Sequence, residues 1–313
     1  MAAWKVLLTD GLEENGQAIL RKSAEVVDRS GITADELLKV VGEYDAVIVR
    51  GRTKVTAAVF DAAPNLKAVG RAGVGVDNID LHAAKQHKVT VVNSPLATTV
   101  AVAELTMGLM LSLVREIPRA DTALKSGKWL KKELEGAELY EKTLGIIGYG
   151  RIGQTVAKRA IAFDMRIVAF DPLRPTEEVC QDGCEPLTLE GLLAKSDFIT
   201  LHTPLTDQTR GMLGADQFAI MKDGVYLVDA ARGGVVDENA LLDALNSGKV
   251  AGAALDVFAV EPQGATPLVN HPRVIGTPHV GAQTVEAQQR AANDIATEVV
   301  RALRGEELRW RVA

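Results

Sequence analysis

Three side chains suited to acid–base chemistry on a bound anion come soon after short apolar runs. They are Arg232, Glu261 and His279, which follow the runs 225–229, 251–255 and 274–276. An arginine can bind a carboxylate, a histidine can transfer a proton near neutral pH, and a carboxylate can orient the imidazole and favour its protonated form. Oxidation of a 2-hydroxy acid needs these three roles, so the trio is a candidate catalytic set.

The apolar runs before these side chains belong to a series of predicted parallel strands. We expect strands near 144–147, 166–170, 197–201, 225–228, 251–255 and 273–276, with helices near 151–163, 188–194 and 237–247. Six strands joined by crossovers indicate a doubly wound sheet, in which the carboxyl ends of the strands meet at one edge. The three side chains are therefore predicted to face one crevice.

A glycine-rich turn lies between the first predicted strand and the first predicted helix of this series. In Gly148-Tyr-Gly150-Arg-Ile-Gly153, the first glycine permits a tight turn, the second lets the backbone approach a pyrophosphate, and the third lets the helix lie close to the sheet. Asp171 ends the next strand, where an acid can accept hydrogen bonds from the adenosine ribose. Its charge would repel a 2′-phosphate, so the pattern predicts NAD rather than NADP. Methyltransferases also carry lone glycine patterns, but the strand, helix and acid together favour a dinucleotide.

The chain before residue 95 predicts a second, smaller α/β domain. Short β-branched runs near 5–9, 25–27, 46–49, 67–70 and 90–92 alternate with helical patterns near 12–22, 33–41, 55–62 and 78–87. A long apolar helix near 98–117 follows, and a polar-faced helix near 284–304 comes after the last strand. Since that last helix follows no strand of its own in the second sheet, we expect it to pack on the first domain.

The predicted fold class is therefore α/β with two domains. Residues 95–283 form a doubly wound, parallel-sheet NAD-binding domain of the Rossmann type. Residues 1–94 and 284–313 form a discontinuous, flavodoxin-like substrate domain.

Composition and charge narrow the classes of function. The net charge of -6 at pH 7 argues against a general binder of nucleic acid or of anionic membranes. The two cysteines, Cys180 and Cys184, supply neither a zinc quartet nor a disulfide framework, so we expect free thiols and no metal site. The N-terminus lacks signal-peptide features, and the longest apolar stretch, 100–114, is shorter than a membrane span. We expect a cytoplasmic protein.

The chain resembles the D-2-hydroxyacid dehydrogenase superfamily, and within it the phosphoglycerate-specific branch. Seven ordered motifs carry the resemblance: Arg71-Ala-Gly-Val-Gly-Val-Asp77-Asn78, Gly148-Tyr-Gly-Arg-Ile-Gly153, His202-Thr-Pro204, Ala231-Arg-Gly-Gly234, Ala254-Leu-Asp-Val-Phe258, Glu261-Pro262 and Pro278-His279. The resemblance implies that Arg232 binds the substrate carboxylate and the C2 oxygen. It also implies that His279 takes the C2 hydroxyl proton as hydride leaves for the nicotinamide, while Glu261 bonds the other imidazole nitrogen. A homodimer or homotetramer is expected.

The resemblance also assigns contacts to the cofactor and to the substrate. The residues implied for NAD are Val74, Gly148, Gly150, Arg151, Ile152, Gly153, Asp171, His202, Thr203, Pro204, Ala230, Ala231, Arg232, Asp256, His279, Val280, Gly281 and Ala282. Those implied for the substrate are Arg50, Arg71, Val74, Gly75, Arg232 and His279. In this scheme Asp256 faces the nicotinamide carboxamide, and the backbone amides of the glycine loop meet the carboxylate.

Arg50 and Arg71 bear on the choice of acid. Arg50 ends a predicted strand and Arg71 begins the glycine loop, and both match positions where the phosphoglycerate branch grips a phosphate. A pair of surface arginines is the alternative, because Arg52 and Lys54 lie close in sequence. The implied reaction is the NAD-dependent oxidation of D-3-phosphoglycerate to 3-phosphohydroxypyruvate, the first step of phosphorylated serine biosynthesis.

Two other functions remain open. A glyoxylate or hydroxypyruvate reductase would need no phosphate grip and would often prefer NADPH, so Asp171 and Arg71 count against it. An NAD-sensing, protein-binding module would keep much of the same site, but no long disordered tail supports that function. The chain ends at Ala313, so we expect it to lack the C-terminal regulatory domain that some relatives carry.

Overall fold

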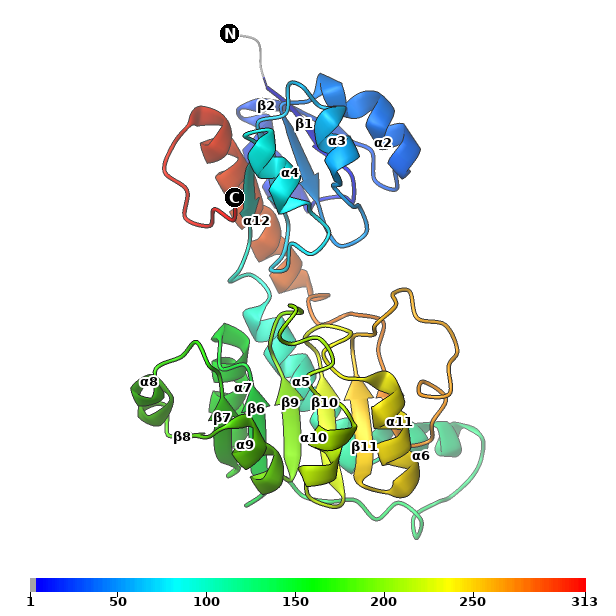
Figure 1. Ribbon diagram of the computed structural model, residues 1–313. Helices are drawn as coiled ribbons and strands as arrows, with labels where there is room; N and C mark the ends of the chain where they lie inside the picture. The colour runs from blue at the N-terminus through cyan, green and yellow to red at the C-terminus, as the bar shows by residue number, and fades with distance from the viewer. Residues whose placement is uncertain (1–3) are drawn as a thin grey trace. The chain divides into compact units, whose positions relative to one another are not determined.

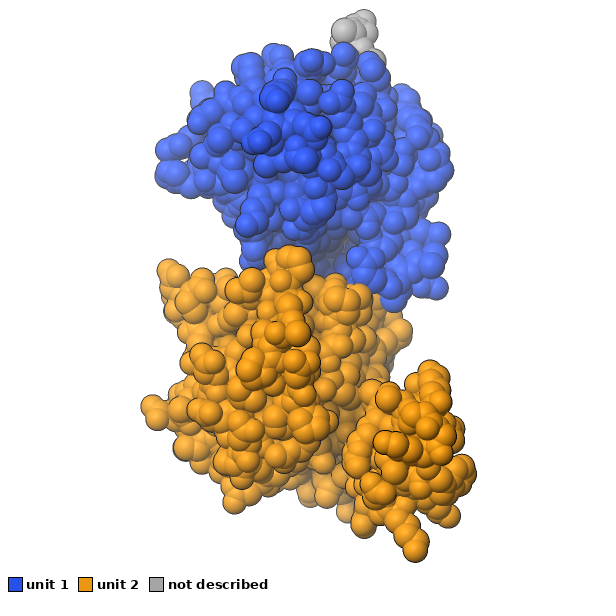
Figure 2. Space-filling view, turned by 90° about the vertical axis from the view of Figure 1, so that its right-hand side faces the viewer, with its two compact units in different colours: residues 1–98, 282–313 blue, residues 99–281 orange. Residues whose placement is uncertain are grey.

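The computed structural model describes residues 4–313, which divide into two compact units. Unit 1 runs to Thr98 and resumes at Ala282–Ala313, whereas unit 2 comprises Thr99–Gly281 (Figure 2). The sequence places the domain boundaries after residues 94 and 283, and the contacts place them after Thr98 and Gly281. Residues 1–3 of the predicted first domain lie outside the described residues.

Unit 1 is built on a parallel sheet with the strand order β2-β1-β3-β4-β5 (Figure 1). Its strands are β1 (Trp4–Leu8), β2 (Ala24–Asp28), β3 (Ala46–Val49), β4 (Ala68–Arg71) and β5 (Thr90–Asn93). Its helices are α1 (Glu14–Arg21), α2 (Ala34–Val40), the 3-10 turn η1 (Val41–Glu43), α3 (Ala57–Asp61), α4 (Leu81–Gln86) and α12 (Val285–Arg304). This strand order is that of flavodoxin-like folds.

Alternate residues along the strands of unit 1 pack against helices on opposite faces. Leu7 and the strand residues on the same face of the sheet pack against α2, α3 and α4. Val6 and Leu8, on the opposite face, pack against α1 and α12. Helix α12 lies very close to its neighbours, since a Cβ on Gly16 would be 2.6 Å from the Ala292 carbonyl oxygen. This close packing holds the C-terminal helix on the unit that begins the chain.

Unit 2 is a doubly wound parallel sheet with the order β12-β11-β10-β9-β6-β7-β8, and the predicted α/β fold class is confirmed (Figure 1). Its strands are β6 (Thr143–Ile147), β7 (Arg166–Phe170), β8 (Glu185–Pro186), β9 (Phe198–Leu201), β10 (Val225–Asp229), β11 (Val250–Leu255) and β12 (Val274–Gly276). Helices α5 (Thr99–Val114) and α7 (Arg151–Ile161) cover one face. Helices α9 (Leu189–Lys195), α10 (Ala215–Ile220) and α11 (Glu238–Ser247) cover the other.

Several short or interrupted elements differ from the prediction. The helix expected near 98–117 ends at Val114, because Glu116 adopts a left-handed φ of 48° before α6 (Ile117–Lys125) begins. Helices α8 (Thr176–Gln181) and α10, and the two-residue strand β8, were not predicted. Each of these spans too few residues to show a hydrophobic period.

No helix among residues 4–313 combines the length and apolar composition needed to cross a bilayer. The same residues contain no cluster of three or more histidine, cysteine, aspartate or glutamate side chains arranged to hold a metal ion.

Candidate active site and dinucleotide site

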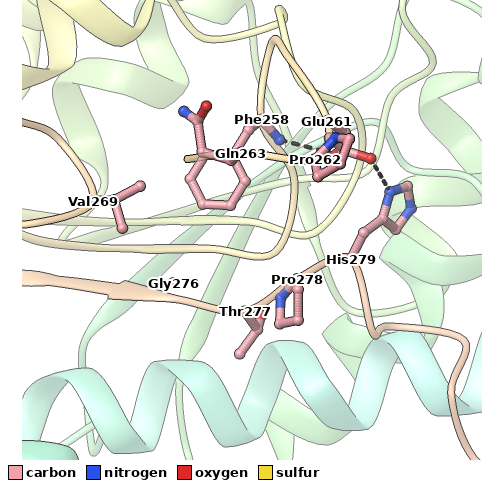
Figure 3. A pocket seen from close by; sticks show the side chains of 9 residues that line it. All are labelled: Phe258, Glu261, Pro262, Gln263, Val269, Gly276, Thr277, Pro278 and His279. Atoms are coloured by element: carbon pink, nitrogen blue, oxygen red, sulfur yellow. Dashed lines mark hydrogen bonds and ion pairs between the residues drawn. The ribbon is translucent and has the colours of Figure 1, made fainter. Parts of the chain in front are cut away.

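His279 and Glu261 form a hydrogen-bonded pair at the carboxyl edge of the unit 2 sheet. Nδ1 of His279 lies 2.7 Å from Oε2 of Glu261, and Oε1 of Glu261 accepts the Phe258 backbone N–H at 3.1 Å (Figure 3). The His279 side chain is 46% exposed, so its ring can meet a ligand. Because Glu261 occupies Nδ1, Nε2 is the nitrogen that can exchange a proton with a ligand.

Asp256 holds the turn that presents His279. This carboxylate follows β11, is 1% exposed, and accepts hydrogen bonds from the Val280 N–H, the Gly281 N–H and the Thr277 hydroxyl. The His279 N–H in turn donates to the Asp256 carbonyl at 2.8 Å. These bonds maintain His279 at a left-handed φ of 53°, a conformation that costs a non-glycine residue about 1 kcal/mol. Asp256 therefore orients the histidine turn, whatever further contact it makes with a ligand.

Arg232 lies on the loop after β10, which packs against the loop that carries Glu261. A Cβ on Gly233 would come within 1.8 Å of the Phe258 carbonyl oxygen, so the two loops touch at this glycine. The Arg232 Nη1 donates to the Ala231 carbonyl at 2.6 Å. The structure thus brings the predicted trio together from three loops of one sheet edge.

The electrostatics of the pair favour a charged carboxylate. Burial raises the pKa of Glu261, but the hydrogen bonds from His279 and the Phe258 N–H, together with the charges of His279 and Arg232, outweigh it and lower the pKa overall. An ionised carboxylate accepts hydrogen bonds and cannot donate them. In the neutral imidazole the hydrogen is therefore assigned to Nδ1, and Nε2 is left without one.

A pocket of about 390 Å³ adjoins the pair. Its lining consists of Phe258, Glu261, Pro262, Gln263, Val269, Gly276, Thr277, Pro278 and His279 (Figure 3). The lining carries no arginine or lysine among the described residues, so a phosphate group would meet no guanidinium or ammonium group from it.

The glycine turn has the geometry that a pyrophosphate requires. Gly148 adopts a φ of 90°, and a Cβ there would lie 2.7 Å from the His202 carbonyl oxygen. A Cβ on Gly153 would lie 2.3 Å from the Gly148 carbonyl oxygen, which explains how α7 sits against the turn. Gly150, at the N-cap of α7, has no heavy atom within 4 Å of the position of an added Cβ. The backbone N–H groups at the start of α7 are therefore open to a phosphate.

Asp171 is oriented toward this turn by the backbone. Its Oδ2 accepts the Tyr149 N–H at 2.8 Å and its Oδ1 accepts the Leu173 N–H at 2.9 Å. The Tyr149 side chain anchors the same turn, because its buried hydroxyl lies 3.1 Å from both Asp182 Oδ2 and Cys184 Sγ. The two backbone hydrogen bonds from Tyr149 and Leu173 hold the Asp171 carboxylate beside the glycine turn.

His202, next to the turn, carries an unsatisfied polar atom. Its Nε2 lies 3.1 Å from the Thr200 hydroxyl, whereas Nδ1 is buried with no hydrogen-bond partner among the described residues. Burial lowers the pKa of His202 to about 3, so the ring is neutral. An orphaned ring nitrogen beside an open helix N-terminus fits a bound dinucleotide.

The other residues assigned to NAD in unit 2 lie at the same strand ends. Arg151 and Ile152 begin α7, Thr203 and Pro204 follow β9, Ala230 and Ala231 follow β10, and Val280 and Gly281 follow His279. Val74 and Ala282 belong to unit 1.

In unit 1, Arg50 and Arg71 have different surroundings. The Arg50 Nη2 pairs with Glu13 Oε2 at 2.5 Å, and its Nε donates to the Gly11 carbonyl at 3.1 Å. Arg71 lies over the glycine loop, since a Cβ on Gly73 would fall 1.4 Å from its Nη1. Val74 and Gly75 continue this loop, and Asn93 Nδ2 fixes it by donating to the Val74 carbonyl at 2.7 Å. Arg71 therefore lies beside the predicted carboxylate loop, and the guanidinium of Arg50 is held by Glu13 and the Gly11 carbonyl.

Two residues with a part in the site were not assigned from the sequence. Asp229, at the end of β10, is 2% exposed, and its Oδ1 accepts the Ala231 N–H at 2.9 Å. Tyr149 was considered only as the spacer of the glycine pattern. The strand-end position marks Asp229 in the sequence, but only the packing reveals that its carboxyl is buried behind the Arg232 loop.

The chain is similar to several known proteins. Residues 107–281 match the family model described as "D-isomer specific 2-hydroxyacid dehydrogenase, NAD binding domain". The chain is 50% identical over 303 residues to a D-3-phosphoglycerate dehydrogenase of Methanocaldococcus jannaschii, covering 96% of this chain and 58% of that protein. It is 46% identical over 307 residues to a hydroxypyruvate reductase of Thermotoga maritima, covering 97% and 99%. Its fold is similar to that of an Aquifex aeolicus D-lactate dehydrogenase complexed with NAD and lactic acid, with a TM-score of 0.84, 30% identity and 96% of each chain covered.

Proposed function

Since the chain belongs to the D-isomer specific 2-hydroxyacid dehydrogenase family and unit 2 is that family's NAD-binding domain, we propose that the protein oxidises D-3-phosphoglycerate to 3-phosphohydroxypyruvate with NAD. The reaction would be the first step of phosphorylated serine biosynthesis. The observation that carries the proposal is the Glu261–His279 pair, which leaves Nε2 of an exposed imidazole ready to exchange a proton. The chain spans 58% of the length of the M. jannaschii phosphoglycerate dehydrogenase, so activity and substrate are inferred for this chain from its own residues.

The chain's own side chains account for the proton and for the orientation of the acid. Glu261 accepts the Nδ1 hydrogen of His279, and Nε2 takes the C2 hydroxyl proton in oxidation and returns it in reduction. Arg232 binds the carboxylate and the C2 oxygen, so that the developing carbonyl lies within reach of Nε2. NAD, when bound, supplies the hydride acceptor. The bond from C2 to hydrogen breaks with its electron pair, and the O–H bond breaks with its proton going to His279.

The residues of the dinucleotide site would hold the cofactor as follows. The N-terminus of α7, opened by Gly150, would bind the pyrophosphate, and Asp171 would bind the adenosine ribose. The carboxylate of Asp171 also disfavours a 2′-phosphate.

The phosphate of the substrate is assigned mainly to Arg71. Its guanidinium lies along the loop that contains Val74 and Gly75, whose amides we propose as carboxylate donors. Arg50 contributes less, because Glu13 and the Gly11 carbonyl already bind its guanidinium.

Reduction of hydroxypyruvate is a second candidate, and two observations favour it. The T. maritima hydroxypyruvate reductase matches the chain over 99% of its own length. The pairing of Arg50 with Glu13 also weakens the case for a two-arginine phosphate grip. Both candidates use the same catalytic trio, and they differ by one phosphate group.

Steady-state kinetics separate the two candidates. We would measure kcat/KM with NADH for 3-phosphohydroxypyruvate and for hydroxypyruvate, in wild type, in Arg71→Ala and in Arg21→Ala. Arg21 is a matched control because it lies on α1 in an exposed pair with Glu14. A charge-assisted hydrogen bond contributes about 1.5–3 kcal/mol, so Arg71→Ala should lower kcat/KM about tenfold to hundredfold for the phosphorylated acid only.

Three outcomes would revise the proposal. Equal losses on both acids, or a wild-type preference for hydroxypyruvate, would favour the second candidate. Binding of NAD without turnover of any acid would favour an NAD-sensing module. We further propose that the protein is cytoplasmic and forms a homodimer or homotetramer. Sedimentation of the purified protein would test the number of subunits, and fractionation of cells would test the location.

A further inference from the structure

Asp229 is a buried carboxyl group that the proposed reaction does not use. It ends β10, three residues before Arg232, and its side chain is 2% exposed. Its Oδ1 accepts the Ala231 N–H at 2.9 Å, and its carbonyl accepts the Asp256 N–H at 2.8 Å. Asp229 is therefore fixed to the first residues of the Arg232 loop and to the strand end that supports the His279 turn.

The two buried strand-end carboxyls have unequal surroundings. Asp256 receives hydrogen bonds from Val280, Gly281 and Thr277. The carboxyl of Asp229 receives the Ala231 N–H, and the charged groups that face it are Arg232, Asp256 and His279. Burial raises the pKa of Asp229 to about 7; the charge of Asp256 acts in the same direction, and the Ala231 N–H, Arg232 and His279 oppose it.

The charge on Asp229 bears directly on the anion site. An ionised Asp229 places a negative charge behind the Arg232 loop, in a medium where charges are poorly screened. That charge compensates the guanidinium internally and repels an incoming carboxylate. Protonation of Asp229 removes this repulsion.

We propose that Asp229 is a positioning residue that takes up a proton from solvent when an acid binds to Arg232, so that substrate affinity falls as the carboxyl ionises. This inference rests on the proposed function, because it takes Arg232 as the group that binds the substrate carboxylate. The sign follows from linkage: a ligand that binds better to the protonated form raises the proton occupancy of that form. Affinity for the acid is therefore highest at low pH and declines as pH rises through neutrality.

The direct test is the number of protons taken up when oxalate binds to the NADH-loaded protein. Oxalate presents a carboxylate beside a second pair of oxygens, as a 2-keto acid does, and it cannot be reduced by hydride transfer at C2. Titration calorimetry in buffers of different ionisation enthalpy gives the proton count. We would compare wild type with Asp229→Asn, which keeps an oxygen that can accept the Ala231 N–H and cannot titrate.

A surface aspartate provides the matched control. Asp223 is 92% exposed and pairs with Lys249, so Asp223→Asn makes the same chemical change away from the site. With a pKa of about 7, Asp229 is about half ionised at pH 7 before the ligand binds. On binding oxalate at this pH, wild type and the control should therefore take up about half a proton more than Asp229→Asn. Between about pH 6 and pH 8 the wild-type Kd should rise up to about tenfold more than that of the variant.

The outcomes distinguish this inference from the function on which it rests. Equal proton counts in wild type and Asp229→Asn would overturn the role of Asp229 and leave the dehydrogenase assignment standing. Failure of wild type itself to bind oxalate would count against the anion site, and both proposals would fall. Should the variant not fold, carbon-13 NMR of wild type with labelled aspartate decides. A carboxyl resonance that titrates near neutrality and ceases to do so with oxalate supports the proposal, and its absence overturns it.

Discussion

An added methyl group should have different effects at two glycines of the same turn. Gly148 is surrounded by backbone, since a Cβ would lie 2.7 Å from the His202 carbonyl oxygen and the residue has a φ of 90°. Gly150 faces open space and has an ordinary negative φ of -78°. Gly148→Ala should therefore damage folding, whereas Gly150→Ala should damage binding of NAD.

The magnitudes follow from these contacts. A left-handed alanine costs about 1–2 kcal/mol, and relief of a clash with fixed backbone costs about 1–3 kcal/mol more. Gly148→Ala should thus lose about 3 kcal/mol, or roughly 6–12 °C in Tm for a domain of this size. Gly150→Ala at an N-cap should lose at most about 1 kcal/mol. Its methyl group blocks a charge-assisted phosphate contact, so the Kd for NAD should rise about tenfold to hundredfold.

Thermal unfolding without cofactor and calorimetric titration with NAD measure the two effects separately. Unchanged NAD affinity in Gly150→Ala would refute the assignment of this turn to the pyrophosphate. A loss of stability in Gly150→Ala as large as in Gly148→Ala would refute the distinction between the two glycines.

Two further substitutions test the charges of the site. Glu261→Gln keeps an oxygen that can accept from Nδ1 of His279 but loses its charge, so kcat should fall about tenfold to hundredfold; steady-state rates equal to wild type would contradict the orienting role. Asp229→Asn should stabilise the fold only at higher pH. The folded-state pKa of Asp229, about 7, lies above its ordinary value of 3.8, so the penalty for ionisation is absent below pH 3.8 and complete above about pH 7. Removing it gains at most about 4 kcal/mol at pH 8, and thermal unfolding at pH 4 and pH 8 checks the difference.

The architecture could be predicted from the sequence because each strand or long helix has its own pattern of apolar residues. The strands of unit 2 are continuous apolar runs, as sheets covered on both faces require, and the amphipathic α12 signals its apolar face. The break after Val114 was not predicted, since it depends on the backbone conformation of Glu116 rather than on hydrophobicity. Short elements such as α8 and β8 are determined by tertiary contacts, and their few residues contain no period.

Residue types and spacing suggest the candidate trio, but they do not describe how its side chains are held in place. Glycine spacing and strand-end positions are local, so Gly148, Gly150 and Asp171 could be chosen from the sequence. The anchoring of the His279 turn by Asp256 joins two separate loops. The pairing of Arg50 with Glu13 likewise joins residues 37 positions apart. Neither contact has a sequence signature, because each depends on how the strands are ordered in a sheet.

We propose that Nε2 of His279 carries the proton of the reaction. Asparagine tolerates the left-handed conformation of this position but cannot exchange a proton near neutrality. The decisive measurement is the rate of NADH formation from D-3-phosphoglycerate or another D-2-hydroxy acid by His279→Asn. We predict a rate about a hundredfold to ten-thousandfold below that of wild type, with NAD affinity within a few-fold. Turnover at the wild-type rate in this variant would show that His279 does not carry the proton.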